Sequence, residues 1–143
     1  MILLDANILV RLADRCDMNY TQTCRALEKC QERDLAVCLA PQTLYEFWAV
    51  ATRSPANNGL GMSIDLVHQR TRIYQSLYQV IPEPPEMLAT WTSLVAQYQV
   101  TGFRVHDVRY VAMMQLCDIT HLMTYNTKHY QRFPITLVDP AAF

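Results

Sequence analysis

Three carboxylates of this 143-residue chain stand in apolar surroundings, where an ionised side chain needs a partner. Asp5 directly follows the apolar run Met1–Leu4, and Glu46 lies within an apolar helical pattern. Asp107 stands at the start of another helical pattern, in line with residues four and seven positions later. Carboxylates that converge form an oxygen-rich site suited to Mg²⁺ or Mn²⁺. The question is therefore whether the fold brings these three acids together.

Each acid also has an ordinary structural explanation. Asp5, or Asn7 two residues later, can cap the helix that follows. Asp107 at a helix N-terminus is favoured by the helix dipole. The structural explanation is weaker for the set, because acidic side chains are rarely buried and one core rarely needs three of them.

The segment Leu122–Tyr130 adds neutral oxygen donors to this set. Its apolar start indicates a strand, and Thr124 and Asn126 would lie at the carboxyl end of that strand. Asn126 can coordinate an ion through its side-chain carbonyl or hold a water molecule. The alternative is a polar turn, in which Asn is favoured because it hydrogen-bonds locally. For His106, beside Asp107, we expect a structural or capping role, because adjacent residues of a helix point in different directions.

Alternating helical and strand patterns predict the frame that holds these residues. Short apolar runs indicate strands at the N-terminus and at residues 35–39, 121–124 and 136–138. Helical patterns cover residues 20–33, 42–52, 63–78, 86–99 and 107–116, with Ser63 as a capping residue and a turn-rich loop at 54–61. This alternation predicts a parallel sheet with helices on both faces, in one α/β domain spanning residues 1–143. Asp5 and Thr124 would then lie outside the carboxyl ends of neighbouring strands, where such sheets bind ligands.

Composition bounds the possible functions. Half of the residues are hydrophobic (51%) and 17% are charged, which excludes a disordered chain. A net charge of −1 means that nucleic acid would have to bind a local basic patch. The five cysteines include no C-x-x-C pair, so we expect reduced core thiols rather than a zinc site or a disulfide framework. No apolar stretch is long enough to span a membrane and no secretion signal is evident, so we expect a soluble, cytoplasmic protein.

Taken in order, these segments resemble the PIN domain family of metal-dependent nucleases. The resemblance rests on Leu4-Asp5-Ala6-Asn7, Glu46, Val105-His106-Asp107 and the segment from Thr124 to Tyr130. The loop Asn58-Gly59-Leu60-Gly61 and the run Arg132-Phe133-Pro134 are similar to a bacterial branch of that family, the VapC-like toxins. No single piece is specific, but the ordered set covers nearly the whole chain.

The resemblance implies a three-layer α/β/α PIN-like fold with a central parallel sheet, and hydrolysis of RNA phosphodiesters with Mg²⁺ or Mn²⁺. It also implies a homodimer that acts as the toxin of a toxin–antitoxin pair and is held inactive by a small antitoxin protein. One position departs from the family, which usually has an acid where this chain has Asn126. Fewer anionic ligands weaken the binding of a second metal ion, so a two-metal mechanism is in doubt.

As a hypothesis, Asp5, Glu46 and Asp107 bind the metal directly or through its waters, and Asn7 holds the turn at Asp5. Thr124 and Asn126 would position a metal-bound water or a substrate phosphate. The candidate RNA phosphate contacts are the basic residues that flank the motifs, unless they are ordinary surface charges: Arg104, Arg109, Lys128 and Arg132.

Two other functions compete with this one. A phosphatase with an aspartyl nucleophile would need a second Asp at the position of Asn7. A non-catalytic PIN-fold module that binds RNA or protein would explain Asn126 but not three retained acids.

Overall fold

The apolar N-terminal run forms the central strand of a five-stranded sheet in the computed structural model, which describes residues 1–143. The strands lie in the order β3-β2-β1-β4-β5. All pairings are parallel, so every strand ends at the same edge of the sheet. The strands are short: β1 (Ile2–Leu4), β2 (Val37–Leu39), β3 (Gln79–Val80), β4 (His121–Met123) and β5 (Thr136–Val138).

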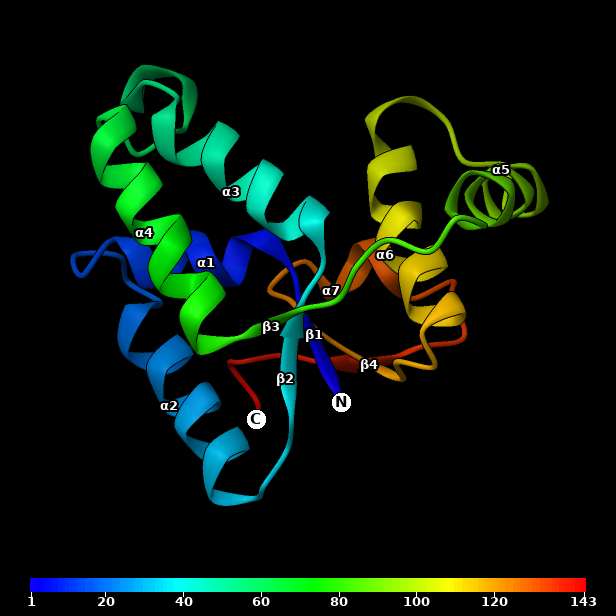
Figure 1. Ribbon diagram of the computed structural model, residues 1–143, viewed down its shortest axis with the longest axis horizontal. Coiled ribbons are helices and arrows are strands. Elements are labelled where there is room, and N and C mark those ends of the chain that lie inside the picture. Colours follow the sequence, from blue (N-terminus) through cyan, green and yellow to red (C-terminus); the bar gives the residue numbers. More distant parts are fainter.

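Helices cover both faces of the sheet (Figure 1). One face carries α1 (Ala6–Ala13), α2 (Tyr20–Glu32), α3 (Pro41–Thr52) and α4 (Ile64–Leu77). The other face carries α5 (Met87–Gln97), α6 (Val105–Leu116) and the short α7 (Thr127–Tyr130). Single turns of 3₁₀ helix at Pro55–Asn57 and Gly102–Arg104 precede α4 and α6.

The pleat of the strands divides the apolar core between these two faces, because successive side chains point to opposite sides. Leu3 of β1 packs with buried residues of α5 and α6. Ile2 and Leu4, its neighbours in the same strand, pack with buried residues of α1 to α4. A sheet with an apolar core on each side is the predicted three-layer α/β/α fold, which is thereby confirmed.

Local signals located most elements to within a few residues. Ser63 caps α4 as predicted, since its Oγ accepts a hydrogen bond from the Leu66 N–H at 3.3 Å. Pro41 occupies the first turn of α3, where its missing N–H costs nothing. No range was predicted for α1, whose apolar residues continue the N-terminal apolar run, or for β3 and α7, because two and four residues are too few to show a period.

The cysteines depart in part from the expected core thiols. All five are free, but only Cys30 and Cys38 are buried, and Cys16 is exposed. Burial raises the pKa of the Cys38 thiol to about 11, which keeps it protonated and inert. No helix combines the length and the apolar character needed to cross a membrane.

Candidate active site

The strand order creates a crevice beside the end of β1. The chain leaves β1 into α1 on one face of the sheet and reaches the neighbouring β4 from α6 on the opposite face. Ligands of open α/β sheets bind at such a switch point, outside the carboxyl ends of the strands. The two strand ends are joined there, because the Asp5 N–H donates to the Met123 carbonyl at 3.0 Å.

Asp5 lies at this point with its carboxylate held by two neutral side chains. Thr124 Oγ1 donates to Asp5 Oδ2 at 2.6 Å, and Asn7 Nδ2 donates to the same oxygen at 2.8 Å. Asn7 Nδ2 also reaches Thr124 Oγ1 at 3.0 Å, so the three side chains form a closed set. Asp5 is in addition the N-cap of α1, accepting a weaker bond from the Asn7 N–H at 3.4 Å. The capping explanation and the site explanation therefore both apply to Asp5.

Burial controls the charge of this carboxyl. Asp5 is only 6% exposed, and desolvation is the largest cause that raises its pKa from 3.8 to about 6. Nearby Glu46 and Asp107 raise it further, while the bonds from Thr124 and Asn7 lower it. The negative charges of Glu46 and Asp107 therefore act on Asp5, and a cation bound among the three acids would relieve this repulsion.

Glu46 is held by two residues that were not identified from the sequence. Gln42 Nε2, one helical turn earlier in α3, donates to Glu46 Oε1 at 2.6 Å. Tyr110 of α6 donates its hydroxyl proton to Glu46 Oε2 at 3.2 Å. Burial raises the pKa of Glu46, with a smaller contribution from Asp107. Burial also raises the pKa of Tyr110 well above its ordinary value, so this residue stays a proton donor.

These two residues also join three elements around the acids. The Tyr110 hydroxyl accepts from the Ala6 N–H at 3.3 Å at the start of α1. Gln42 Nε2 donates to the His106 carbonyl at 2.8 Å and thereby ties α3 to α6. The side-chain amide oxygen of Gln42, Oε1, is buried and has no hydrogen-bond partner. Gln42 stands one turn before Glu46 and Tyr110 three residues after Asp107, which is the only sequence signal that marks them.

Asp107 faces the same region from α6. Its Oδ2 is 3.3 Å from Arg104 Nη1 and 3.3 Å from His129 Nδ1. Arg104 is therefore paired with an acid of the site, and its guanidinium also lies over the Phe103 ring. His129, which sequence spacing did not mark as a ligand, brings α7 against this acid.

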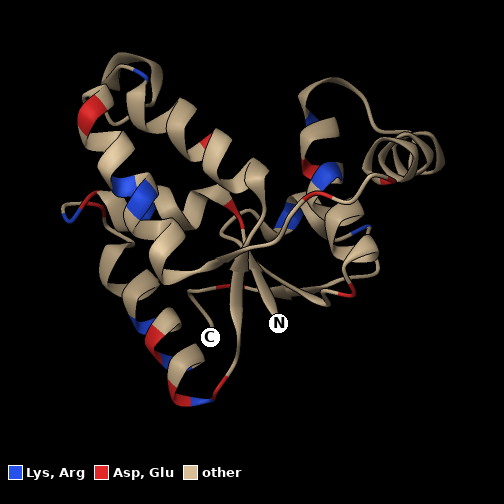
Figure 2. Cartoon of the chain, viewed as in Figure 1, with Lys and Arg blue, Asp and Glu red and all other residues tan.

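An open cavity of about 740 Å³ joins the acids. Figure 2 shows acidic segments on α3, at the start of α6 and at the start of α1 around this central region. Of the predicted site residues, the cavity is lined by Asp5, Asn7, Glu46, Asp107 and Asn126. Thr124 is fully buried and acts on Asp5 from behind.

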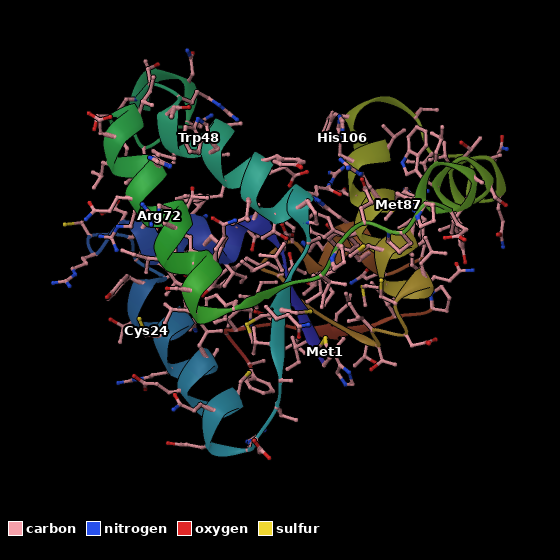
Figure 3. The ribbon with its side chains drawn as sticks, in the orientation of Figure 1. Met1, Cys24, Trp48, Arg72, Met87 and His106 are labelled. Atoms are coloured by element: carbon pink, nitrogen blue, oxygen red, sulfur yellow. The ribbon has the colours of Figure 1, made fainter.

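His106 does not take the predicted capping role, and the alternative structural role stays a prediction. His106 lies at the start of α6 (Figure 3), lines this cavity and makes no capping hydrogen bond. Its charge also lowers the pKa of Glu46. Hydrogen bonds from Trp91 of α5 and Gln42 of α3 to backbone carbonyls hold the first turn of α6, and in this turn His106 and Asp107 both line the cavity.

None of the four predicted phosphate contacts is among the residues that line the cavity. Arg109 donates two hydrogen bonds to Glu83, at 2.6 and 2.9 Å. Arg132 donates to the Tyr98 carbonyl at 3.2 Å, and exposed Lys128 is likewise outside the cavity lining. The arginines that do line it are Arg11 and Arg53, which lie outside the motif segments.

The donor chemistry of the site fits a hard divalent cation. All three acids and Asn126 offer oxygen, and the acids repel one another in their ionised form. No three His, Cys, Asp or Glu side chains lie close enough together to bind one ion. The three acids therefore do not all reach one ion directly, but Mg²⁺ is usually held by one or two carboxylates and keeps several waters, so one or two of them would be enough to hold it.

Comparisons with known proteins bear on the fold. No protein-family model matches the chain, and no curated protein matches it by sequence. Solved structures do match: a chain of a toxin–antitoxin complex from Klebsiella pneumoniae is 23% identical, with a TM-score of 0.66 and 98% of each chain covered. FitAcB from Neisseria gonorrhoeae is 14% identical, with a TM-score of 0.71 and 100% of each chain covered.

A third match is VapC20 from Mycobacterium tuberculosis, described as a toxin that cleaves the sarcin–ricin loop. It is 11% identical, with a TM-score of 0.67, and the match covers 94% of this chain and 98% of that one. Because the matches run from end to end, they concern the arrangement of all the elements around the sheet. The chain therefore has the PIN-domain fold of these toxin–antitoxin proteins, as the ordered motifs predicted.

Proposed function

We propose that this protein is a divalent-metal-dependent ribonuclease. The observation that carries the proposal is the coupling of Asp5, Glu46 and Asp107 within one open cavity at the switch point of the sheet. Perturbed carboxyl groups that share a cleft are characteristic of a catalytic site. A bound Mg²⁺ or Mn²⁺ would supply polarisation of a phosphoryl oxygen and activation of a water molecule.

The residues divide into holding and reacting roles. Thr124 and Asn7 fix the orientation of the Asp5 carboxylate, which together with Asp107 would hold the ion. Glu46 keeps its orientation through Gln42 and Tyr110 and is less buried than Asp5. Burial raises the pKa of both Asp5 and Glu46, and a raised pKa helps a carboxylate to accept a proton near neutral pH. Because Glu46 is the more exposed of the two, it is the group that would orient and deprotonate the attacking water.

The biological role that fits this chemistry is that of the toxin in a toxin–antitoxin pair. Of the structures with this fold, one is described as a toxin–antitoxin complex and another, VapC20, as a toxin. This chain has an apolar groove of about 670 Å³ in which Leu77 of α4 meets Leu12, Leu27 and Leu35. Leu77 is 65% exposed, and Leu66 and Ile73 extend the exposed apolar side of α4. A small antitoxin protein that covers this groove would bury that exposed apolar surface. We also propose that the protein forms a homodimer.

The test is cleavage of a mixed RNA pool by the purified protein with Mn²⁺, Mg²⁺ or EDTA. We expect metal-dependent cleavage, reduced about 10²-fold or more in Asp5→Ala and Asp107→Asn because each removes a ligand or its support. Glu28→Ala is the matched control, since Glu28 is exposed on α2 away from the cavity lining. Cleavage that persists in both site variants would refute the assignment. Absence of cleavage by the folded wild type with either metal would instead favour a binding-only module.

A further inference from the structure

The wall of the cavity formed by α1 and α3 changes character along the helices. From α3, it is lined by Glu46, then by Ala49 and Val50, and Arg53, the C-cap residue directly after the helix, follows them. Residues three, four and seven positions apart share one face of a helix. The face is therefore acidic near the sheet, apolar in the middle and basic at its outer end. Seven residues at 1.5 Å each put Arg53 roughly 10 Å beyond Glu46 along the helix.

Helix α1 lines the same cavity with Asn7, Val10 and Arg11. Asp17 fixes Arg11, because Arg11 Nη1 lies 2.6 Å from Asp17 Oδ2. Two arginines therefore line the cavity, Arg11 from α1 and Arg53 from the end of α3, and Arg11 is already paired.

Arg53 differs from the other arginines of this region because its side chain has no hydrogen bond or ion pair. Arg104 is paired with Asp107, Arg109 with Glu83 and Arg11 with Asp17. A free, exposed guanidinium keeps all its donors for a ligand, and its planar fork matches the oxygens of a phosphate.

The loop after α3 holds the backbone of Arg53 in place. The Gly61 N–H donates to the Arg53 carbonyl at 2.8 Å, and the Leu60 N–H donates to the Val50 carbonyl at 3.1 Å. Gly59 packs so closely that a Cβ there would lie 2.1 Å from the Arg53 carbonyl oxygen. Asn58, the residue before Gly59, adopts a left-handed conformation with φ of 59° and lines the cavity.

We propose that Arg53 and Asn58 bind a backbone phosphate next to the scissile phosphate of a single-stranded RNA, whose chain crosses the apolar strip of Ala49 and Val50. The proposal rests on the proposed ribonuclease activity and names the path of its substrate. Arg53 lies about two helical turns beyond Glu46 in the chain, at the opposite end of the apolar strip, so we assign it a phosphate that flanks the reacting one. The nearly buried position of Asp5 requires a phosphate to enter the cavity, which an unstacked single strand can do.

The experiment measures binding without cleavage. Fluorescence anisotropy of a labelled single-stranded RNA of mixed sequence is recorded in EDTA at several salt concentrations. Arg53→Ala should weaken binding about tenfold and make the slope of log K against log salt shallower by about 0.7, the value for one lost phosphate contact on a single strand. Arg53→Lys should recover the slope but only part of the affinity, since an ammonium lacks the planar fork.

Two further variants separate this contact from general charge. Asn58→Gly should weaken binding without changing the salt slope, because Gly tolerates the positive φ and the lost amide is neutral. Arg72→Ala is the matched control: Arg72 is exposed on α4 (Figure 3) and does not line the cavity. It should bind RNA like the wild type, with the same slope.

The outcomes distinguish the two proposals. Wild-type cleavage together with an unchanged affinity and slope in Arg53→Ala would overturn the assigned path and leave the ribonuclease intact. Equal losses in Arg53→Ala and Arg72→Ala would also overturn it, since the effect would then be one of net charge. Failure of the ribonuclease proposal is read separately, from the absence of metal-dependent cleavage in the wild type.

Discussion

Replacing Asp5 by Asn should stabilise the metal-free protein at neutral pH while strongly reducing the proposed ribonuclease activity. Burial raises the pKa of Asp5 from 3.8 to about 6, so the folded chain keeps a proton that the unfolded chain has already lost. The free energy of unfolding therefore falls as the pH rises from about 4 to about 6, and the loss is complete above that window. Two pKa units at 1.36 kcal/mol each correspond to about 3 kcal/mol.

The substitution removes this cost but also weakens one contact. An Asn side chain can keep an oxygen toward Thr124 and Asn7, whereas its amide nitrogen replaces the oxygen that accepts the 3.4 Å bond from the Asn7 N–H. A neutral hydrogen bond contributes about 1 kcal/mol, so we expect a net gain of about 2 kcal/mol near neutral pH.

The assay is urea unfolding in EDTA, followed by the fluorescence of Trp48 and Trp91, at about pH 4 and about pH 8. The advantage of Asp5→Asn over the wild type should be small or negative in acid and should grow by roughly 2 to 3 kcal/mol at the higher pH. Added Mn²⁺ should stabilise the wild type alone, because an ion that binds only the folded state adds to its stability. A difference that does not change with pH would refute the reasoning that burial, not hydrogen bonding, controls the charge of Asp5.

Two further substitutions test the groups that hold the acids. Tyr110→Phe should cost about 1 to 3 kcal/mol of stability in urea, because the Ala6 N–H and a Glu46 oxygen lose a buried partner. An unchanged unfolding midpoint would show that this bridge contributes nothing. Thr124→Val keeps the side-chain shape but removes a bond that lowers the pKa of Asp5. The acid limb of the pH–rate profile should therefore move to higher pH, and Thr124→Ser, which keeps the hydroxyl, should leave it in place.

Some features of the site follow from the sequence because parallel strands place their carboxyl ends together. Asp5 ends β1 and Thr124 follows β4, so a parallel sheet in which these strands are neighbours had to bring them close. The apolar surroundings of Glu46 and the helical start at Asp107 marked two more acids before any contact was known. The three-layer arrangement followed in the same way, from strand and helix patterns that alternate along the chain.

Other features depend on which helix faces meet, and no local pattern encodes that. Gln42 and Tyr110 read as ordinary helical residues, yet Gln42 holds Glu46 from one turn earlier in α3 and Tyr110 reaches the same carboxylate from α6. Proximity in sequence to the motifs favoured Arg109 and Arg132 as phosphate contacts, but both are bonded elsewhere.

The sequence by itself determined most of the elements, their order and the acids, because periodicity and caps act over a few residues. The tertiary structure alone decided which polar groups hold each carboxylate and which cations reach the cavity. Arg53 is the clearest case, since it belongs to no motif and its place at the cavity comes from the loop that closes α3. Hydrogen bonds between distant residues and the exclusion of water exist only once the helices have packed, so these properties become definite only in the folded chain.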